Sequence, residues 1–155
     1  MATRRHAREA VVALLYAYDL GNEDINDFTD QILEDRKIRN KQKDFALKLF
    51  NGVLSNLTAL DNAISTQIKE WDYDRIGSIE KALLRLGSFE ILFEKVDKAV
   101  VINEAIEISK EFGDEKSPKF INGVLDNIKL IEDAPETELK DEQTIEENEV
   151  KKSDD

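Results

Sequence analysis

Arginine side chains gather at the N-terminal end of the stretch TRRHAREAVVALLYAYDL, residues 3–20. Arg4, Arg5 and Arg8 fall in its first turns with His6 among them, and no acidic residue separates them. A helix N-terminus carries a partial positive charge, so each exposed arginine there costs about 0.3–1 kcal/mol. The planar guanidinium binds a phosphate group through two hydrogen bonds, and phosphate is therefore the ligand that this residue type favours.

An aromatic side chain lies near the same face. At about 100° per residue the arginines occupy an arc of about 100° on the flank of the apolar face. Val12 and Tyr16 fall at the far edge of this arc, away from the buried centre. Arginines for phosphates and a ring for base stacking are typical of a site for single-stranded nucleic acid. Ion pairs with the acidic remainder of the chain are the alternative interpretation.

A second basic and aromatic pair occurs in the segment SPKF, residues 117–120. Lys119 and Phe120 follow the start of the last expected helix, whose free N–H groups attract anions. This indicates a second place for a phosphate or a base. The alternative is that Phe120 belongs to the core.

The available side chains argue against catalysis. The chain has no cysteine and one histidine, and it contains neither a GxGxxG nor a GxxxxGK[ST] phosphate cradle. Glu104 and Glu107 lie one turn apart, which a solvated helix face explains more cheaply than a metal site. We therefore expect no enzyme activity, no cofactor and no metal.

Apolar residues recur at steps of three and four, which predicts an all-α fold with about seven helices. In the first half of the chain we expect a first helix between Thr3 and Gly21, a short second helix through Ile25, Phe28 and Ile32, and one long third helix from Phe45 to Ile68. A connector WDYDR follows at 71–75. In the second half we expect a helix capped by Ser78, a helix with Ile102 and Phe112 inward that ends at Gly113, and a last helix with Ser117 as N-cap and Pro118 as its first residue.

One short motif occurs twice. NGVLSNL at 51–57 and NGVLDNI at 122–128 agree at five of seven positions. The repeat suggests two similar helical halves, each with a glycine at a close helix crossing. We expect Gly52 to mark such a crossing and not the end of a helix.

Charge divides the chain into two parts. The formal net charge is −12, and residues 132–155 contain eleven acidic residues and three lysines. This segment has no aromatic residue and few aliphatic ones, so it cannot bury enough surface to fold. We expect a helical domain over residues 1–132 and a disordered acidic tail over 133–155. The N-terminus has no apolar signal core, and we expect a cytoplasmic protein without a membrane span.

Three blocks of the sequence resemble the NusB family of transcription antitermination factors. They are RRHAREAVVALLYAYDL, WDYDRIGSIEKALLRLGSFEIL and VVINEAIEISKEFGDEKSPKFINGVLDNI, in that order. The resemblance implies an all-helical fold of two three-helix subdomains. It also implies a non-catalytic, RNA-binding protein that binds the single-stranded boxA element of nascent ribosomal RNA together with NusE, a small-subunit ribosomal protein. The pair then joins NusA, NusG and RNA polymerase.

The resemblance also assigns roles to individual residues. The positions that it implies for RNA binding are Arg4, Arg5, His6, Arg8, Tyr16, Lys119 and Phe120. Those that it implies for the NusE surface are Glu80 and Tyr16, and a first-turn helix acid is the alternative interpretation of Glu80.

Several residues depart from the family pattern. His6 stands where an arginine is frequent, so we expect a weaker or pH-sensitive RNA site. Lys116 stands where an acid is common, which puts the base preference there in question. Asp97 and Lys98 stand where the family commonly has a proline, at the entry to the INEAI helix. We expect this difference to alter only a loop.

Two alternatives to an antitermination factor remain. One is the NusB-like RNA-binding domain of an rRNA methyltransferase, of which this chain would be a fragment. The other is a protein-interaction module whose arginines pair within a homodimer.

Overall fold

The structure is a computed structural model that describes residues 3–68 and 76–130, apart from the side chain of Glu23. Over these residues it contains seven α-helices, one 3₁₀ helix and no strand, which confirms the predicted all-α class. The elements in chain order are α1 (Arg4–Asp19), η1 (Glu23–Phe28), α2 (Thr29–Asp35), α3 (Asn40–Ser55), α4 (Leu57–Thr66), α5 (Ser78–Leu92), α6 (Lys98–Phe112) and α7 (Ser117–Asp126).

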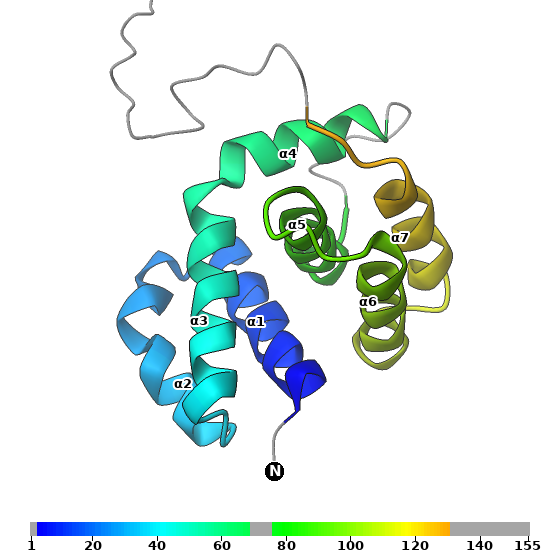
Figure 1. The fold of residues 1–155 in the computed structure, drawn as a ribbon. Coiled ribbons are helices and arrows are strands. Elements are labelled where there is room, and N and C mark those ends of the chain that lie inside the picture. The colour runs from blue at the N-terminus through cyan, green and yellow to red at the C-terminus, as the bar shows by residue number, and fades with distance from the viewer. Residues whose placement is uncertain (1–2, 69–75, 131–155) are drawn as a thin grey trace, which may run out of the picture.

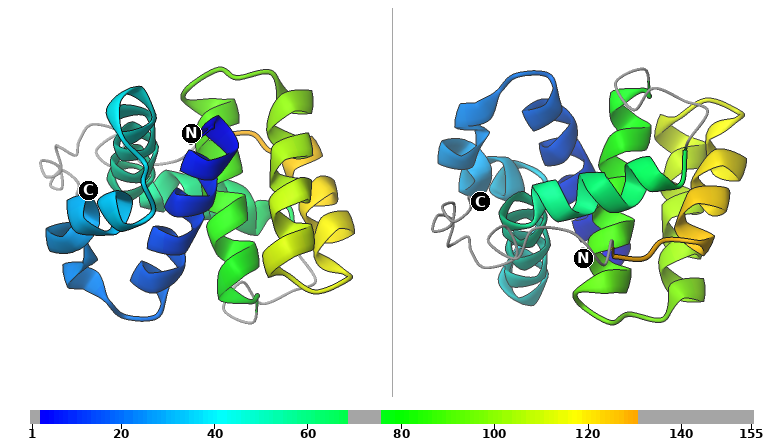
Figure 2. Two further views of the ribbon diagram at one scale, coloured as in Figure 1. Left: turned by 90° about the horizontal axis from the view of Figure 1, so that it is seen from below. Right: turned by 90° about the horizontal axis from the view of Figure 1, so that it is seen from above.

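The helices form two groups of three, as the resemblance implies. Helices α1, α2 and α3 lie on one side, α5, α6 and α7 lie on the other, and α4 crosses one end (Figure 1). The groups meet where α1 packs against α5, and α5 also contacts α3, α4, α6 and α7. Figure 2 shows α1 and α5 side by side through the middle of the molecule. Helix α5 is therefore central, and every residue from 81 to 90 is buried.

The buried face of α1 is wider than the sequence predicts. Val12, expected away from the core, is 2% exposed, and Arg8 and Leu15 are buried as well. The reason is that α1 lies between α3 and α5, so two sides of the helix are covered. A helical wheel identifies the most apolar face of α1. It does not show that a second helix packs against the side of that face.

The ends of α1 follow the prediction. The Thr3 hydroxyl accepts a hydrogen bond from the His6 N–H at 3.2 Å, which makes Thr3 the N-cap. Gly21 has φ +105°, a left-handed conformation that favours glycine after a helix.

The single long third helix was a wrong prediction. The chain bends at Asn56, which has φ −119° and ψ 23° and whose side-chain N–H donates to the Gly52 carbonyl at 2.8 Å. This local bond competes with the helix hydrogen bonds and separates α3 from α4. Gly52 does mark a close crossing, because a Cβ built there would lie 2.1 Å from Cζ of Phe89 on α5, far inside van der Waals contact.

The second copy of the repeated motif does not make a crossing. In the described part of the chain, nothing lies within 4 Å of a Cβ built on Gly123. The repeat therefore reflects similar sequence on two helices and not two equivalent contacts, which corrects the prediction.

Three further local predictions need correction. Ser78 and Ser117 are the first residues of their helices and not the N-caps, and each hydroxyl instead bonds a carboxylate. Phe112, expected in the core, is 45% exposed at the end of α6. The expected stop at Gly113 is confirmed, since Gly113 is the C-cap of α6.

Some predictions fall outside the described residues. These are the connector at 71–75 and the acidic tail with its boundary at residue 132. Within the described part of the chain, none of the helices has the length and apolar character that crossing a membrane requires.

Candidate nucleic-acid interface

The N-terminus of α1 is built around a reciprocal cap. The Thr3 hydroxyl accepts from the His6 N–H, and Nδ1 of His6 accepts from the Thr3 N–H at 3.0 Å. This is a capping box in which histidine takes the place of the usual Glu or Gln. The geometry requires an unprotonated Nδ1, so the ring carries its proton on Nε2. His6 is exposed, and Nε2 is the nitrogen left for a ligand.

Arg4 is exposed and lies on an aromatic ring. Its guanidinium carbon is 4.1 Å from the centre of the Phe45 ring, and that of Arg8 is 5.2 Å from the same centre. Cations over a ring face are stabilised by the ring quadrupole. Phe45 belongs to α3, so this contact holds the start of α1 against the first turns of α3.

Arg5 pairs with Glu104 across helices. Nε and Nη2 of Arg5 donate to the two carboxylate oxygens of Glu104 on α6, at 2.8 and 2.9 Å. The side chains are 43% and 20% exposed. The hydrogen bond raises the pKa of Arg5, and it lowers the pKa of Glu104. Both groups are therefore charged at neutral pH. Sequence reasoning had placed Glu104 on a solvated face and missed this pair.

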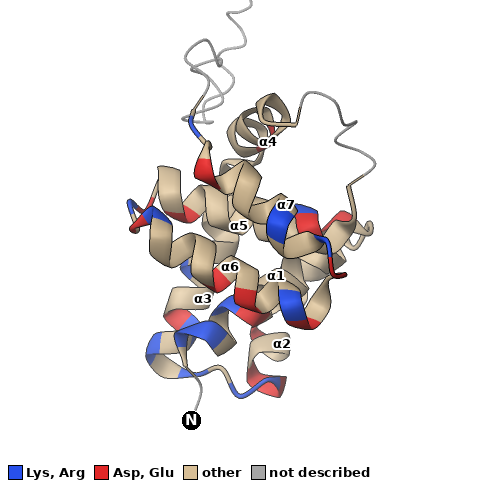
Figure 3. Cartoon of the chain, turned by 90° about the vertical axis from the view of Figure 1, so that its right-hand side faces the viewer, with Lys and Arg blue, Asp and Glu red and all other residues tan. Residues whose placement is uncertain are grey.

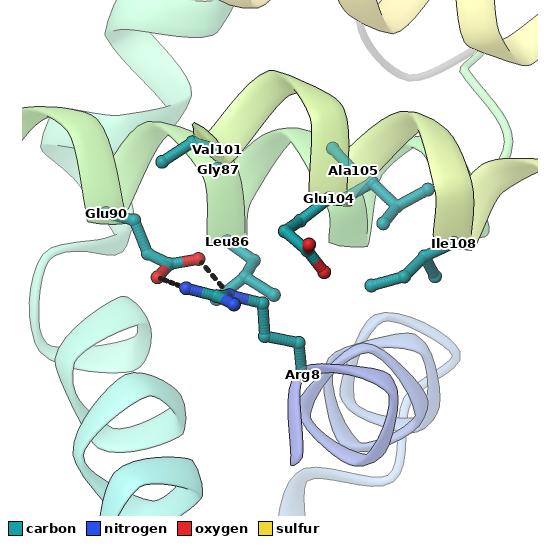
Figure 4. Close-up of a pocket in the computed structure, with 9 residues that line it drawn as sticks. Arg8, Leu86, Gly87, Glu90, Val101, Glu104, Ala105 and Ile108 are labelled. Atoms are coloured by element: carbon teal, nitrogen blue, oxygen red, sulfur yellow. Dashed lines mark hydrogen bonds and ion pairs between the residues drawn. The ribbon is translucent and has the colours of Figure 1, made fainter. Parts of the chain in front are cut away.

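The Arg8 side chain is buried and forms an ion pair in the interior. Its Nε and Nη2 donate to Glu90 of α5 at 2.9 and 2.8 Å, and the two side chains are 9% and 2% exposed. Figure 4 shows Arg8 reaching from α1 toward Glu90, with Glu104 of α6 nearby on the same small pocket. The pair joins the two helix groups. Contact of Arg8 with RNA stays a prediction, while Arg4 and Arg5 are the arginines that reach solvent.

An acidic neighbour limits the positive field of this helix. Partial burial raises the pKa of the Glu9 carboxyl, and repulsion from Glu111 of α6 adds to the effect. The cationic surface therefore lies at the very start of α1 and does not continue along its α6 side.

A second group of predicted residues lines an open pocket of about 590 Å³ beside α7. The carboxylate of Glu80, in the first turn of α5, accepts a short hydrogen bond from the buried hydroxyl of Ser117. Asp114 in turn accepts from the Ser117 N–H at 3.1 Å and from the Lys116 N–H at 2.9 Å. We call this the α7 pocket, and its lining residues are Ile76, Gly77, Glu80, Asp114, Glu115, Lys116, Ser117, Lys119 and Phe120.

The α7 pocket brings three predicted residues together. Lys119 is exposed, Phe120 is half-buried and packs against the core, and Glu80 is half-buried. The core interpretation of Phe120 is supported in part, because the ring packs against the core and also lines the pocket, and its contact with RNA stays a prediction. Lys116, one of the departures from the family pattern, lies on the same rim.

The predicted residues form two groups at opposite ends of α1. At one end Arg8 bonds Glu90 near the C-terminus of α5. At the other end Asp19 accepts from Ser78, the first residue of α5, at 2.7 Å. Since α1 has 16 residues, these ends are about 24 Å apart. Tyr16 is 38% exposed on α1, one turn before the end that adjoins the start of α5.

Sequence reasoning missed Phe45 and Glu90 as partners of the arginines. Glu90 carried a signal, since it stands as an acid within the otherwise apolar run SFEILF and would need a cation if buried. Among the residues that the structure describes, no three His, Asp or Glu side chains gather closely enough to hold a metal ion.

Fold and site together define the class of this protein. It is an all-helical protein of two three-helix groups, with arginine side chains exposed at the N-terminus of its first helix. Residues 5–130 match the model of the NusB family, and the chain belongs to this family.

Several relatives and structural neighbours carry the NusB name. The chain is 64% identical over 128 residues to the transcription antitermination protein NusB of Sulfurimonas denitrificans, which covers 83% of this chain and 97% of that protein. A solved structure described as antitermination factors NusB and NusE in complex with double-stranded RNA superposes with a TM-score of 0.71 at 32% identity, covering 79% and 92% of the two chains. NusB of T. maritima gives a TM-score of 0.72 at 35% identity, covering 89% and 97%.

Proposed function

We propose that this chain is a non-catalytic, RNA-binding antitermination factor that acts in the cytoplasm. It binds boxA-type single-stranded RNA of nascent ribosomal transcripts together with NusE. The pair joins the antitermination complex of RNA polymerase with NusA and NusG. Membership of the NusB family and the names of its relatives support this proposal.

The observation that carries the proposal is the exposure of Arg4 and Arg5 at the N-terminus of α1. Neither charge is favoured there by the helix dipole, and the first turn holds no acid to offset them. Arg5 has a counter-charge in Glu104 of α6, whereas Arg4 makes no ion pair with the described residues. An RNA phosphate would therefore supply a negative charge at Arg4 and replace Glu104 at Arg5. Its two oxygens match the guanidinium fork that now holds the carboxylate of Glu104.

The α7 pocket is the proposed meeting place of RNA and NusE. Lys119 and Phe120 offer a cation and a ring to RNA. Glu80 offers a carboxylate to the basic NusE protein, and Tyr16 contributes exposed aromatic surface. The neighbouring structure of NusB and NusE in complex with double-stranded RNA supports RNA and NusE as the two ligands.

The test of RNA binding compares boxA-like and scrambled single-stranded RNA over a salt series, with and without NusE. Arg4→Ala/Arg5→Ala should weaken binding and make the salt dependence shallower, by about 0.7 in log–log slope for each phosphate that the variant no longer neutralises. Lys110→Ala/Lys129→Ala is the matched control, because it removes the same charge from exposed positions on α6 and after α7. Equal affinity of both variants and the wild type would reject the α1 site.

Arg8 is left out of this test for a structural reason. Substitution of Arg8 would leave the buried carboxylate of Glu90 without a counter-charge. A loss of RNA binding could then reflect unfolding. The pair of substitutions at Arg4 and Arg5 avoids this ambiguity because both side chains are exposed.

The test of the NusE surface uses Glu80→Gln and Ser117→Ala. Both change the hydrogen bond between the two side chains, but only the first removes a charge. We expect Glu80→Gln to weaken NusE binding by roughly tenfold, as for one partner of an interfacial charge pair, and Ser117→Ala to weaken it less. Equal losses would mean that Glu80 only positions the loop before α7.

A further inference from the structure

A run of cations occupies the connection from α2 to α3. The segment RKIRNKQK, residues 36–43, contains five lysines and arginines and no acid, in a chain whose net charge is −12. Neither the α1 site nor the α7 pocket includes any of these residues. The run is therefore a charged surface without an assigned role.

One residue of this connection, Lys37, has a backbone conformation that glycine adopts at a lower energetic cost. Helix α2 ends in a Schellman motif, in which the Lys37 N–H donates to Glu34 at 2.9 Å and the Ile38 N–H donates to Leu33 at 2.8 Å. Lys37 has φ +62°, the left-handed conformation in which a non-glycine residue is strained. Ile38 is buried beneath the turn at 2% exposure. The turn thus points a lysine outward at a conformational cost.

The cations of this run are open to a ligand. Arg36, Lys37 and Lys41 are exposed and make no ion pair with the described residues. Arg39 pairs with Glu34 at 2.8 Å, and both side chains are more than half exposed. Lys43 lies 3.5 Å from Asp30, whose side chain is 76% exposed. Such exposed pairs contribute little and exchange readily with another anion.

This surface adjoins the proposed RNA site. The guanidinium of Arg4 covers the ring of Phe45 on α3, so the start of α1 touches the first turns of α3. Lys41 precedes Phe45 by four residues and lies on the same face of α3. Figure 3 shows the connection from α2 to α3, blue over much of its length, at the end of the molecule where the N-terminus lies.

We propose that the exposed cations of residues 36–43 bind the backbone phosphates of RNA that flanks the element held at the α1 site. The inference rests on the proposed function and extends it to a longer RNA footprint. These contacts would be independent of base sequence, since the run offers charges and no aromatic ring. A polyanion fits better than a protein partner, because the run's single apolar side chain, Ile38, is buried and the surface lacks an apolar anchor.

The experiment measures binding of the full chain with NusE to two RNAs over a salt series. One is the boxA-like element alone, and the other is the same element between unstructured flanks. The test variant is Lys37→Gln/Lys41→Gln, and the control is Lys110→Gln/Lys129→Gln, which removes the same charge on α6 and after α7. Thermal unfolding of each variant checks that the fold is kept.

We expect the flanks to tighten binding to the wild type and to the control. The test variant should gain less from the flanks than the wild type, because it lacks two of the five cations of the run. Its salt slope on the flanked RNA should be shallower by about 0.7 for each lysine that neutralises a phosphate of a single strand, and it should bind the short RNA like the wild type. Flanks that add nothing, or a test variant that gains as much from the flanks as the wild type, would overturn the inference while leaving the proposed function intact. Failure of the wild type to bind the short RNA would instead reject the proposed function.

Discussion

Arg8 of α1 and Glu90 of α5 form a buried ion pair with two hydrogen bonds, of 2.9 and 2.8 Å. The pair lies where the two helix groups meet and is almost completely shielded from water. The last arginine of the RRxxR pattern can therefore serve the fold while Arg4 and Arg5 face solvent. The same helix turn combines a structural cation with the cations that we propose for RNA.

Removal of one partner of this pair should destabilise the protein strongly. Arg8→Ala leaves the Glu90 carboxylate buried without a counter-charge, and we expect a loss of about 3 kcal/mol in the free energy of unfolding. Urea unfolding followed by circular dichroism measures the change. Arg8→Met/Glu90→Leu replaces both charges with apolar side chains and should recover most of the loss.

The same double variant separates the two roles of Arg8. If Arg8 acts only through Glu90, the folded Arg8→Met/Glu90→Leu protein binds boxA-like RNA as tightly as the wild type. A fall in affinity without a fall in stability would assign Arg8 to RNA as well.

Glu104 competes with RNA for Arg5 in the proposed site. Glu104→Gln removes the charge that holds the guanidinium, so we expect RNA affinity to rise by about threefold, the scale of an exposed ion pair. Glu107→Gln is the matched control on the same helix, since Glu107 forms an ion pair with Lys110 and affects Arg5 only through a weaker charge interaction. A filter-binding or anisotropy titration gives the comparison. Equal increases in both variants would indicate only a change in overall charge.

The pair between Arg5 and Glu104 also makes a prediction about pH. The pKa of Glu104 lies below its ordinary value of 4.5, because Arg5 stabilises the charged carboxylate. A lowered acid pKa adds stability that is complete above the ordinary value and is lost as the pH falls through the lower one. The stability difference between the wild type and Glu104→Gln should therefore be constant from about pH 8 to pH 5 and shrink in more acidic solution. A difference that grows with acid would contradict this linkage.

Periodicity predicted the fold class and most helices because apolar spacing reports directly on burial. Periodicity failed where a single side chain determines the path of the backbone. Asn56 bends the chain by bonding the Gly52 carbonyl, and the apolar pattern continues across the bend without a sign of it. It also failed at Phe112, since spacing cannot tell that no neighbouring helix covers the end of α6.

The sequence named the residues of the candidate site as a hypothesis, but it did not predict how they are arranged. Sequence spacing brought Arg4, Arg5 and Arg8 onto one side of α1. Only the packing of α5 against α1 reveals that Arg8 meets Glu90 and leaves solvent. Long-range pairs of this kind join positions far apart in the chain and have no local signature.

The repeated motif offers a paired test of helix packing. Gly52→Ala would place a methyl group 2.1 Å from Cζ of Phe89, so we expect a loss of about 2 kcal/mol from overpacking. Gly123→Ala meets open space within α7 and should stabilise the protein by up to about 1 kcal/mol through helix propensity. Unfolding midpoints in urea should therefore move in opposite directions. Similar shifts would mean that Phe89 moves away without cost.

His6 has a measurable structural role in the cap of α1. His6→Ala removes the acceptor of the Thr3 N–H, and we expect a loss of about 1 kcal/mol in the free energy of unfolding. His6→Gln keeps an acceptor at the same capping-box position and should retain the stability of the wild type. RNA binding by these two variants then distinguishes the cap from a ligand contact. If Nε2 of His6 contacts RNA, His6→Gln loses RNA affinity while its stability is unchanged. If His6 serves only the cap, His6→Gln matches the wild type in both RNA affinity and stability.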